Sequence, residues 1–402
     1  MLSLTAFGIA SLSRPIGALI LGSVGDRYGT KTAIEIALLL VGFSTLIMSL
    51  LPTYSDIGPF APALLFALRF CQGFGIGGNT VTTMIYAKEH NESGGIAVAL
   101  AYGANFSGLI LGNLICIILK NTLNNDQLQE FGWRIAFAVG SIAAISGFFM
   151  KFFVKNDTPN PQYDLRDHYK KVFSPKNLKP IFTFVGIASF GFTSFFTVFV
   201  WMPAVLSGLL KPPIPHTLIV NLCVMLVTLV FFIPFAGMII DRTNPLHIIA
   251  FAFFTGSIGF PISYSLIIHF KTTFVYGVVI FICGIWCAVT APAQFIYVEK
   301  RFPPEERVTA MSFGNHLSSA IFGGFTPAIA VVLFKVNKYL PPVLVTGTGV
   351  LSLICLYIAH TSLPTYEDDS TDVSKSEENI AQEIVEEEID EGIKAQSAEN
   401  VV

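Results

Sequence analysis

The sequence carries little charge for its length. Only 13% of its 402 residues are Asp, Glu, Lys or Arg, whereas 53% are hydrophobic. A chain of that composition cannot cover a globule with a hydrated surface, so the soluble classes of protein are excluded. Long apolar runs, 37 Phe and 33 Gly are present instead, and they fit a helix bundle in lipid.

Groups that could hold a metal or perform catalysis are also scarce. All six cysteines lie inside apolar runs, and Cys283 and Cys287 lack the spacing and the His partners of a zinc site. We expect these thiols to be buried and inert. No paired metal ligands and no nucleophile with a base occur at membrane depth. The sequence therefore predicts no cofactor, no metal and no enzymatic activity.

Acidic charge is concentrated at the C-terminal end. Residues 367–402 hold 13 Asp and Glu against two Lys, which gives a net charge of −11 there and leaves +8 for the rest. The basic residues of the rest lie in short loops between apolar runs, which membrane topology explains better than binding to nucleic acid. The tail allows a short amphipathic helix, but a disordered acidic tail is the preferred interpretation.

Eleven apolar runs are long enough to cross a bilayer, which takes about 20 mostly apolar residues. The runs lie at 2–24, 32–51, 60–86, 94–119, 134–154, 180–206, 216–240, 246–268, 272–298, 308–334 and 342–362. A polar stretch, 155–179, separates five of them from six. The pattern predicts an all-α polytopic membrane protein with helical bundles at 1–154 and 180–362, the 155–179 loop between them and a tail at 363–402.

The loops differ in their content of Lys and Arg. Fourteen basic residues would share one face of the membrane and six the other. Since cationic loops stay on the cytoplasmic side, we expect an integral plasma membrane protein, in a bacterium an inner membrane protein, with the tail in the cytoplasm. Met1 would then start outside, and one further helix before it would give six spans in each half.

A charged turn occurs twice, 215 positions apart. The two copies are Gly22-Ser-Val-Gly-Asp26-Arg27-Tyr-Gly29-Thr-Lys31 and the weaker Gly237-Met-Ile-Ile-Asp241-Arg242. Each copy follows one apolar run and precedes another. A membrane unit repeated in two halves is typical of transporters whose substrate site lies between two bundles.

The first copy resembles the loop after the second helix of the major facilitator superfamily, which reads Gly-x-x-x-Asp-Arg-x-Gly-x-Lys/Arg. Other segments are similar to its metabolite:proton symporter branch, which includes the proline/betaine, dicarboxylate and shikimate transporters. These segments are Arg14-Pro15-Ile-Gly17, Arg69-Phe-Cys-Gln72-Gly73, Gly132-Trp133-Arg134 and Phe322-Gly323-Gly324. The resemblance covers residues 5–362 and implies eleven of the usual twelve helices, with the first one absent.

The resemblance also implies a function. A member of this branch is a secondary active transporter that moves a small organic solute, such as proline, betaine or a carboxylate, by proton symport and alternating access. Its partners would be the solute, protons and membrane lipid, and no nucleic acid. Asn79 stands where the branch usually has Glu, which leaves proton coupling less certain than the fold. A non-transporting membrane sensor or a truncated inactive remnant is the alternative.

In that family the repeated turn closes the inner gate. A carboxylate at the end of one helix can meet the positive N-terminal end of a helix in the opposite half. We therefore expect Asp26 to meet the run that starts near Val308, and Asp241 to meet the run that starts near Gly94. A solvated polar turn is the alternative for both.

Two arginines lie deep in apolar runs. Arg14 precedes Asp26 by twelve residues, which is about 18 Å of helix, and Arg69 reaches a similar depth. An unpaired charge there costs about 2.5–3.5 kcal/mol, so each cation needs a cavity or a partner. Either could hold the solute carboxylate. The alternative is a structural bond to carbonyls or polar neighbours inside one bundle.

Other candidates for the substrate or proton path are amides and indoles. Gln72, Asn79 and Asn315 lie within apolar runs and are alternatively interhelical hydrogen-bond partners. Trp201 or Trp286 could stack on a quaternary amine beside the arginine of the third run. The neighbouring His316 ranks lower, because a lone histidine in a membrane is more often a structural donor.

Glycines are concentrated in a few runs. They are Gly73, Gly75, Gly77, Gly78, Gly108, Gly112, Gly323 and Gly324. Close helix packing is their default explanation, and such small interfaces would let one bundle rock on the other.

Overall fold

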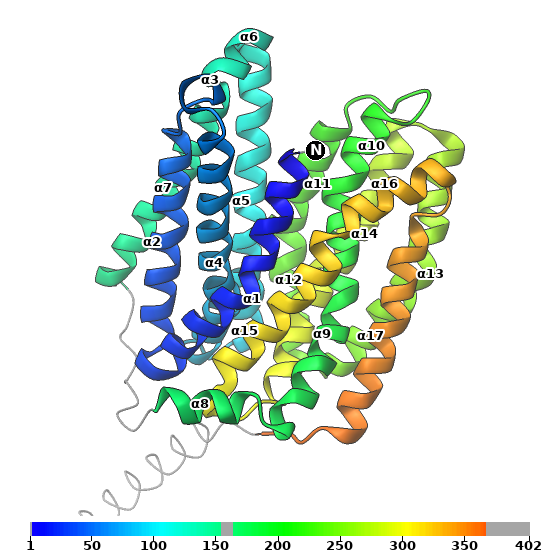
Figure 1. Ribbon diagram of the computed structural model, residues 1–402. Coiled ribbons are helices and arrows are strands. Elements are labelled where there is room, and N and C mark those ends of the chain that lie inside the picture. Colours follow the sequence, from blue (N-terminus) through cyan, green and yellow to red (C-terminus); the bar gives the residue numbers. More distant parts are fainter. Residues whose placement is uncertain (1, 154–163, 367–402) are drawn as a thin grey trace, which may run out of the picture. The chain divides into compact units, whose positions relative to one another are not determined.

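The computed structural model describes residues 2–153 and 164–366, and within these ranges the chain is helical and contains no strand (Figure 1). The described residues up to Pro364 form one compact unit. The acidic residues of the predicted tail lie outside the described residues.

The N-terminal half follows the predicted runs closely. Its long helices are α1 (Leu2–Tyr28), α2 (Thr30–Ser49), α4 (Phe60–Glu89), α5 (Gly94–Thr122) and α7 (Trp133–Phe153), and its short ones are α3 (Tyr54–Ile57), α6 (Asn125–Gln127) and η1 (Leu128–Gly132). Helix α4 is central, because α1, α2 and α5 all pack against it, while α7 packs on α2.

Helical turns of the π type interrupt three of the long helical segments of the C-terminal half. Six such segments are described in this half. They are α9 (Pro175–Phe195), η2 (Phe196–Trp201) and α10 (Met202–Gly208); α11 (Thr217–Val227), η3 (Thr228–Phe232) and α12 (Ile233–Arg242); α13 (Pro245–Phe270); α14 (Thr273–Glu299); η4 (Pro304–Glu306), α15 (Arg307–Ser318), η5 (Ser319–Gly324) and α16 (Thr326–Val336); and α17 (Pro342–Ser362). Helix α17 packs on α9 and α13, and α13 packs on α14.

Each of the eleven predicted runs coincides with one long helical segment. Among the described residues, nine segments are long and apolar enough to cross a membrane by length and composition. The other two, α1 and α7, have 27 and 21 residues, and about 20 suffice to span. Many large apolar side chains point outward, among them Phe251 and Phe274, as expected of a surface in contact with lipid.

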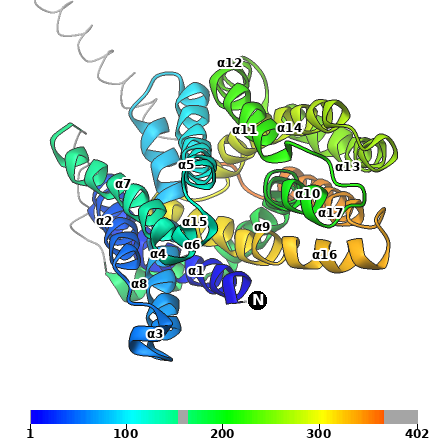
Figure 2. The same ribbon diagram turned by 90° about the horizontal axis from the view of Figure 1, so that it is seen from above.

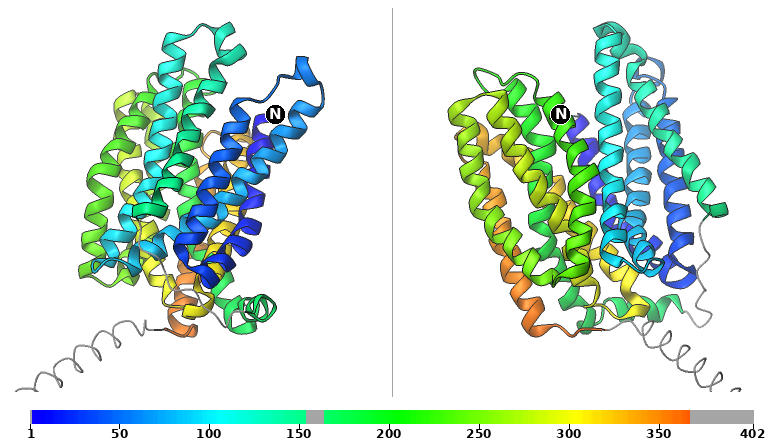
Figure 3. Two further views of the ribbon diagram at one scale, coloured as in Figure 1. Left: turned by 90° about the vertical axis from the view of Figure 1, so that its left-hand side faces the viewer. Right: turned by 180° about the vertical axis from the view of Figure 1, so that it is seen from behind.

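The two halves meet mainly along two helix pairs, α1 with α15 and α5 with α12. In addition α4 packs on α15, α1 on η5, and α5 on α11 and α14. Figure 2 looks along the helices and shows both pairs, and Figure 3 shows them from the side and from behind. Because α1 and α12 both end in the repeated charged turn, the two pairs are related by the internal repeat.

The polar stretch between the halves contains more structure than the predicted loop. Asp164 caps helix α8 (Leu165–Val172) by accepting a hydrogen bond from the Arg166 N–H at 2.9 Å. Helix α9 then starts at Pro175, five residues before the predicted run, because proline is well suited to the first helical position. The hydropathy pattern missed both features, since these residues are polar.

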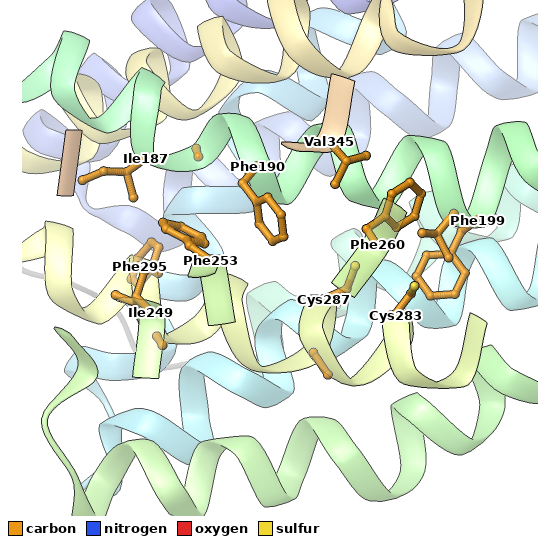
Figure 4. Packing of buried hydrophobic residues seen from close by; sticks show 14 of the residues in the cluster. Ile187, Phe190, Phe199, Ile249, Phe253, Phe260, Cys283, Cys287, Phe295 and Val345 are labelled. Carbon is orange, nitrogen blue, oxygen red and sulfur yellow. The ribbon is translucent and has the colours of Figure 1, made fainter. Parts of the chain in front are cut away.

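The C-terminal half has a continuous aromatic core. Figure 4 shows Phe190 packed against Phe253, with ring centroids 5.2 Å apart, and Cys283 and Cys287 among such side chains. All six cysteines are free thiols. The prediction that they are buried is wrong for Cys116 and Cys223, which are exposed on helix faces turned away from the interior. The hydropathy pattern showed that both lie inside apolar runs, but it did not show which face of the helix they occupy.

Candidate functional site

Asp26 closes the contact between α1 and α15. Its carboxylate accepts hydrogen bonds from the Val308 N–H at 3.1 Å and from the Thr309 N–H at 2.9 Å. The Thr309 hydroxyl donates a third, at 2.5 Å. These amides belong to the first turn of α15, which has no carbonyl partners for them within the helix. The carboxylate is only 2% exposed, so the alternative of a solvated turn does not fit Asp26.

Small residues around the turn allow this approach. A Cβ at Gly22 would lie 2.8 Å from the Thr309 Cα, so a larger residue would force the two helices apart. Gly29 has φ 95°, a backbone conformation that glycine adopts without steric cost, and it lets α2 start directly after α1. Lys31 is buried with its ammonium 3.9 Å from Glu35. The Arg27 guanidinium lies 4.8 Å from the centre of the Tyr28 ring.

The second copy of the turn makes the related contact. Asp241 accepts hydrogen bonds from the Gly95 N–H at 2.5 Å and the Ile96 N–H at 3.1 Å, at the start of α5. A Cβ at Gly237 would lie 2.7 Å from the Ile96 Cα. Asp241 itself is exposed, as is Arg242. Both contacts expected from the sequence are present, and their role in a gate stays a prediction.

Helix α8 covers the Asp26 contact, which the sequence did not indicate (Figure 1). His168 Nε2 lies 3.1 Å from the Thr309 hydroxyl oxygen and 3.5 Å from Asp26. Because that hydroxyl donates to Asp26, its oxygen accepts a hydrogen bond from His168. Desolvation by burial lowers the pKa of His168 to about 4, so the ring is neutral near pH 7 and the contact is no ion pair. The Tyr169 hydroxyl donates to Ser23 of α1 at 3.2 Å.

A charged cluster joins the two halves beside this contact. Glu299, at the end of α14, is 1% exposed and lies 2.9 Å from the Lys88 ammonium of α4 and 3.6 Å from the Arg307 guanidinium. The sequence analysis missed this cluster. The sequence did contain a sign of it, because Lys88, Glu299 and Arg307 border three apolar runs on the same predicted face of the membrane.

The two deep arginines have different surroundings. Arg69 stays within the N-terminal half: it donates to the Gln72 side chain at 2.9 Å, Gln72 donates to Thr45 at 2.9 Å, and the guanidinium lies 5.1 Å from the Phe137 ring centre. Arg14 reaches across the interface and donates to the Ser319 hydroxyl at 3.2 Å. Arg69 thus matches the structural alternative, and Arg14 is the deep cation that lies between the halves.

The two indoles pack inside the C-terminal half. Trp201 is buried against Tyr264 and Phe334, with ring centroids 6.1 and 5.9 Å apart. The Trp286 ring packs against Gly259 of α13, where an added Cβ would be only 2.5 Å from the ring. Both tryptophans thus contact helices of their own half. Among the described residues no ring or hydrogen-bond contact joins either indole to Arg69, and the composite site stays a prediction.

The remaining candidates lie on α4 and α15. Asn79 accepts a hydrogen bond from the Thr83 hydroxyl at 3.0 Å, and this bond lies within α4 and is not the interhelical one of its alternative. Asn315 is half-buried. Its neighbour His316 is 2% exposed, and neither ring nitrogen has a hydrogen-bond partner. The expectation that His316 is a structural donor is therefore wrong.

The glycines of the glycine-rich runs differ in how closely neighbouring helices approach them. A Cβ at Gly77 would lie 2.1 Å from the Arg14 carbonyl oxygen, so α1 and α4 touch there through their backbones. A Cβ at Gly108 or Gly112 would meet nothing within 4 Å. Close packing explains Gly77 and is wrong for the other two, because their side of α5 faces away from the neighbouring helices.

Gly77→Ala is therefore expected to destabilise the protein by about 1–3 kcal/mol, because the added methyl group forces α1 away from α4. Gly108→Ala makes the same chemical change in a helix without a steric conflict and serves as the matched control. Thermal unfolding in detergent checks this: Gly77→Ala should melt clearly below the wild type and Gly108→Ala should not. Equal melting temperatures for the two variants would contradict it.

Paired spans in two related halves, joined at one end by repeated carboxylates, define the class of two-bundle membrane transporters. The family model of the Major Facilitator Superfamily matches residues 1–327, and the chain belongs to this family. It is an integral membrane protein and a secondary transporter, and it is not an enzyme.

Two curated relatives and a solved structure agree with this. The chain is 28% identical to a "Putative proline/betaine transporter" of Staphylococcus aureus (strain COL), over 90% of this chain and 79% of the relative. It is 27% identical to a "Citrate-proton symporter" of Salmonella typhi, over 84% and 78%. The structure of the proton:xylose symporter XylE from E. coli superposes with a TM-score of 0.70 at 16% identity, covering 90% and 86% of the two chains.

Proposed function

We propose that this protein is a proton symporter of a small organic solute that bears a carboxylate group. The names of its relatives support this class, since proline, betaine and citrate all carry carboxylates. The observation that carries the proposal is the Arg14 guanidinium, which lies between α1 and η5 at mid-helix and donates a hydrogen bond to the neutral Ser319 hydroxyl of the C-terminal half. A buried cation of this kind calls for an anion.

The proposed mechanism is alternating access of two bundles, at 1–154 and 180–362. The contacts of Asp26 with α15 and of Asp241 with α5 close the end of the interface that carries them. This end is assigned to the cytoplasm because Lys and Arg are concentrated there. Releasing both carboxylates opens the interface inward, and the helices then separate around the site at Arg14. The C-terminal tail lies in the cytoplasm in this arrangement.

The test is uptake by proteoliposomes that contain the full-length protein. With an inward proton gradient, labelled proline, glycine betaine, citrate and other dicarboxylates are added in turn. At least one solute should accumulate, and an uncoupler should abolish the accumulation because it dissipates the gradient. Uptake that is indifferent to the uncoupler would refute proton coupling. No uptake of any of these solutes would refute the proposed substrate class.

A further inference from the structure

Among the described residues, His316 is the buried histidine that lies within a membrane-spanning segment, and the proposed mechanism gives it no role so far. It lies on α15 nine residues after the helix begins at Arg307, which is about 13 Å along the helix axis. Its side chain is 2% exposed, and neither Nδ1 nor Nε2 has a hydrogen-bond partner. A buried polar group without a partner is costly, and each such group in a native structure needs an explanation, of which a functional role is one.

Arg14 of α1 lies beside the face of α15 that carries His316, because it reaches Ser319 and residues three apart on a helix share a face. Its Nε is also buried without a hydrogen-bond partner, although Nη1 donates to Ser319 three residues after His316. Two neighbouring side chains from opposite halves therefore hold unused hydrogen-bonding groups. Ser319 begins the π-helical turn η5, and such turns are frequent at functional sites.

Among the described residues, no other charge faces His316 from the middle of the membrane. Helix α15 packs against α1, α4, α9, η4 and η5. Besides Arg14, the charged groups of these elements are Asp26, Arg27, Arg69, Lys88, Glu89, Lys176, Lys179, Glu305 and Glu306, and the last two lie just before α15 begins. Asp26 lies at the start of α15, the lysines and Glu89 stand at helix ends, and Arg69 is bound to Gln72 inside the N-terminal half. The Arg14–His316 pair is thus a cation beside a titratable base, with no carboxylate next to it.

We propose that Arg14 and His316 together bind the carboxylate of the transported solute and that His316 carries the coupled proton. This rests on the proposed function and deepens it, because it names the group that is protonated. The guanidinium donates a hydrogen bond to one carboxylate oxygen, and the protonated imidazole donates to the other. Both donor geometries are ordinary for a carboxylate, which can accept at both oxygens.

Charge balance explains the coupling. The empty site holds a single positive charge, on Arg14. Adding a carboxylate and a proton adds one negative and one positive charge, so the net charge of the loaded site is unchanged. Adding only the proton would bury two cations side by side. Adding only the carboxylate would leave one of its oxygens with the neutral imidazole, whose N–H is a weaker donor than that of the protonated ring. The proton is therefore held only together with the carboxylate, and the carboxylate is bound more tightly when His316 is protonated.

Release follows from the same contact. Arg14 is on α1 and His316 is on α15, so the site is complete only while these helices touch. When they separate, the carboxylate loses one of its two partners and leaves with water, and the proton on His316 Nε2 or Nδ1 passes to water on the open side. No covalent bond is made or broken apart from N–H.

The test compares wild type with His316→Gln, which keeps a hydrogen-bond donor and cannot carry the proton. His269→Gln, on the exposed end of α13, is the matched control. Proton uptake on binding of proline, glycine betaine or citrate is counted by calorimetry in buffers of different ionisation enthalpy. Proteoliposomes then report proton-driven accumulation and solute exchange without a gradient. His316→Asn is a second variant, in case the first does not fold.

The wild type and His269→Gln should take up a proton with the solute. His316→Gln should bind and exchange solute but lose the proton uptake, and its accumulation should fall by at least about tenfold, the effect of about 1.4 kcal/mol. If His316→Gln still takes up a proton and accumulates solute normally, the inference is wrong and the proposed function stands. If proton uptake depends on His316 but no solute is transported, the inference stands and the proposed function fails. A wild type that binds none of these carboxylates overturns the inference.

Discussion

Asp26→Asn should open the contact between α1 and α15 and reduce transport more than any other single change in the repeated turns. The amide keeps one acceptor oxygen but directs an NH2 group at donors on α15, and hydrogen bonds to a charged group contribute about 1.5–3 kcal/mol each. A loss of about 3 kcal/mol lowers the ratio of closed to open protein roughly 100-fold. Hydrogen exchange of the Val308 and Thr309 amides measures this directly, because Asp26 holds both.

Asp241→Asn is the matched control for that experiment. Its carboxylate is exposed and accepts from two backbone amides, with no hydroxyl and no covering helix. We expect faster exchange at Gly95 and Ile96 in this variant, a smaller transport defect, and unchanged exchange at the start of α15. The assignment of Asp26 as the stronger contact fails if exchange at Val308 stays at the wild-type rate in Asp26→Asn.

Glu299→Gln should have the second large effect. It removes the carboxylate between Lys88 and Arg307 and leaves two cations together in a buried place between the halves. Removing one partner of a buried ion pair costs about 3–5 kcal/mol. The variant should melt well below the wild type in detergent and should favour the arrangement in which α4 and α14 are apart.

A double-mutant cycle separates this contact from general destabilisation. Lys88→Met removes one of the two cations, so the Lys88→Met/Glu299→Gln double variant should be more stable than the sum of the single effects predicts, by at least about 0.5 kcal/mol. Lys171→Met is the control, since its pairs with Glu305 and Glu306 involve an exposed ammonium, and it should melt with the wild type. Strict additivity in the cycle would show that Lys88 and Glu299 do not depend on each other.

The partners of the two acidic turns could be predicted from sequence because the reasons are local. A carboxylate after an apolar run and a helix start at the same membrane face attract each other, and the repeat relates Asp26 with Val308 to Asp241 with Gly95. The spans themselves follow from hydropathy, which also gives the depth of Arg14 and Arg69. The position of each span and the depth of these residues in the membrane could therefore be predicted from the sequence.

The direction in which a deep side chain faces could not be predicted. Arg14 and Arg69 reach similar depths, but the rotation of α1 and α4 about their axes decides that only Arg14 faces the other half. The same rotation turns Trp201 and Trp286 into their own half, leaves Gly108 without a neighbour and brings His316 to Arg14. Helix α8 was missed for another reason: it is held by His168 and Tyr169 against groups far away in the sequence, and its own composition is polar.

The most direct test of the account is whether solute movement drives protons through the protein. Proteoliposomes with wild-type protein and no imposed gradient are given an outside excess of a transported carboxylate solute, and the external pH is recorded. The account predicts that the outside becomes more alkaline as solute enters, that the change disappears with an uncoupler, and that His316→Gln admits solute without it. Solute entry into wild-type vesicles with no movement of protons would contradict the central claim.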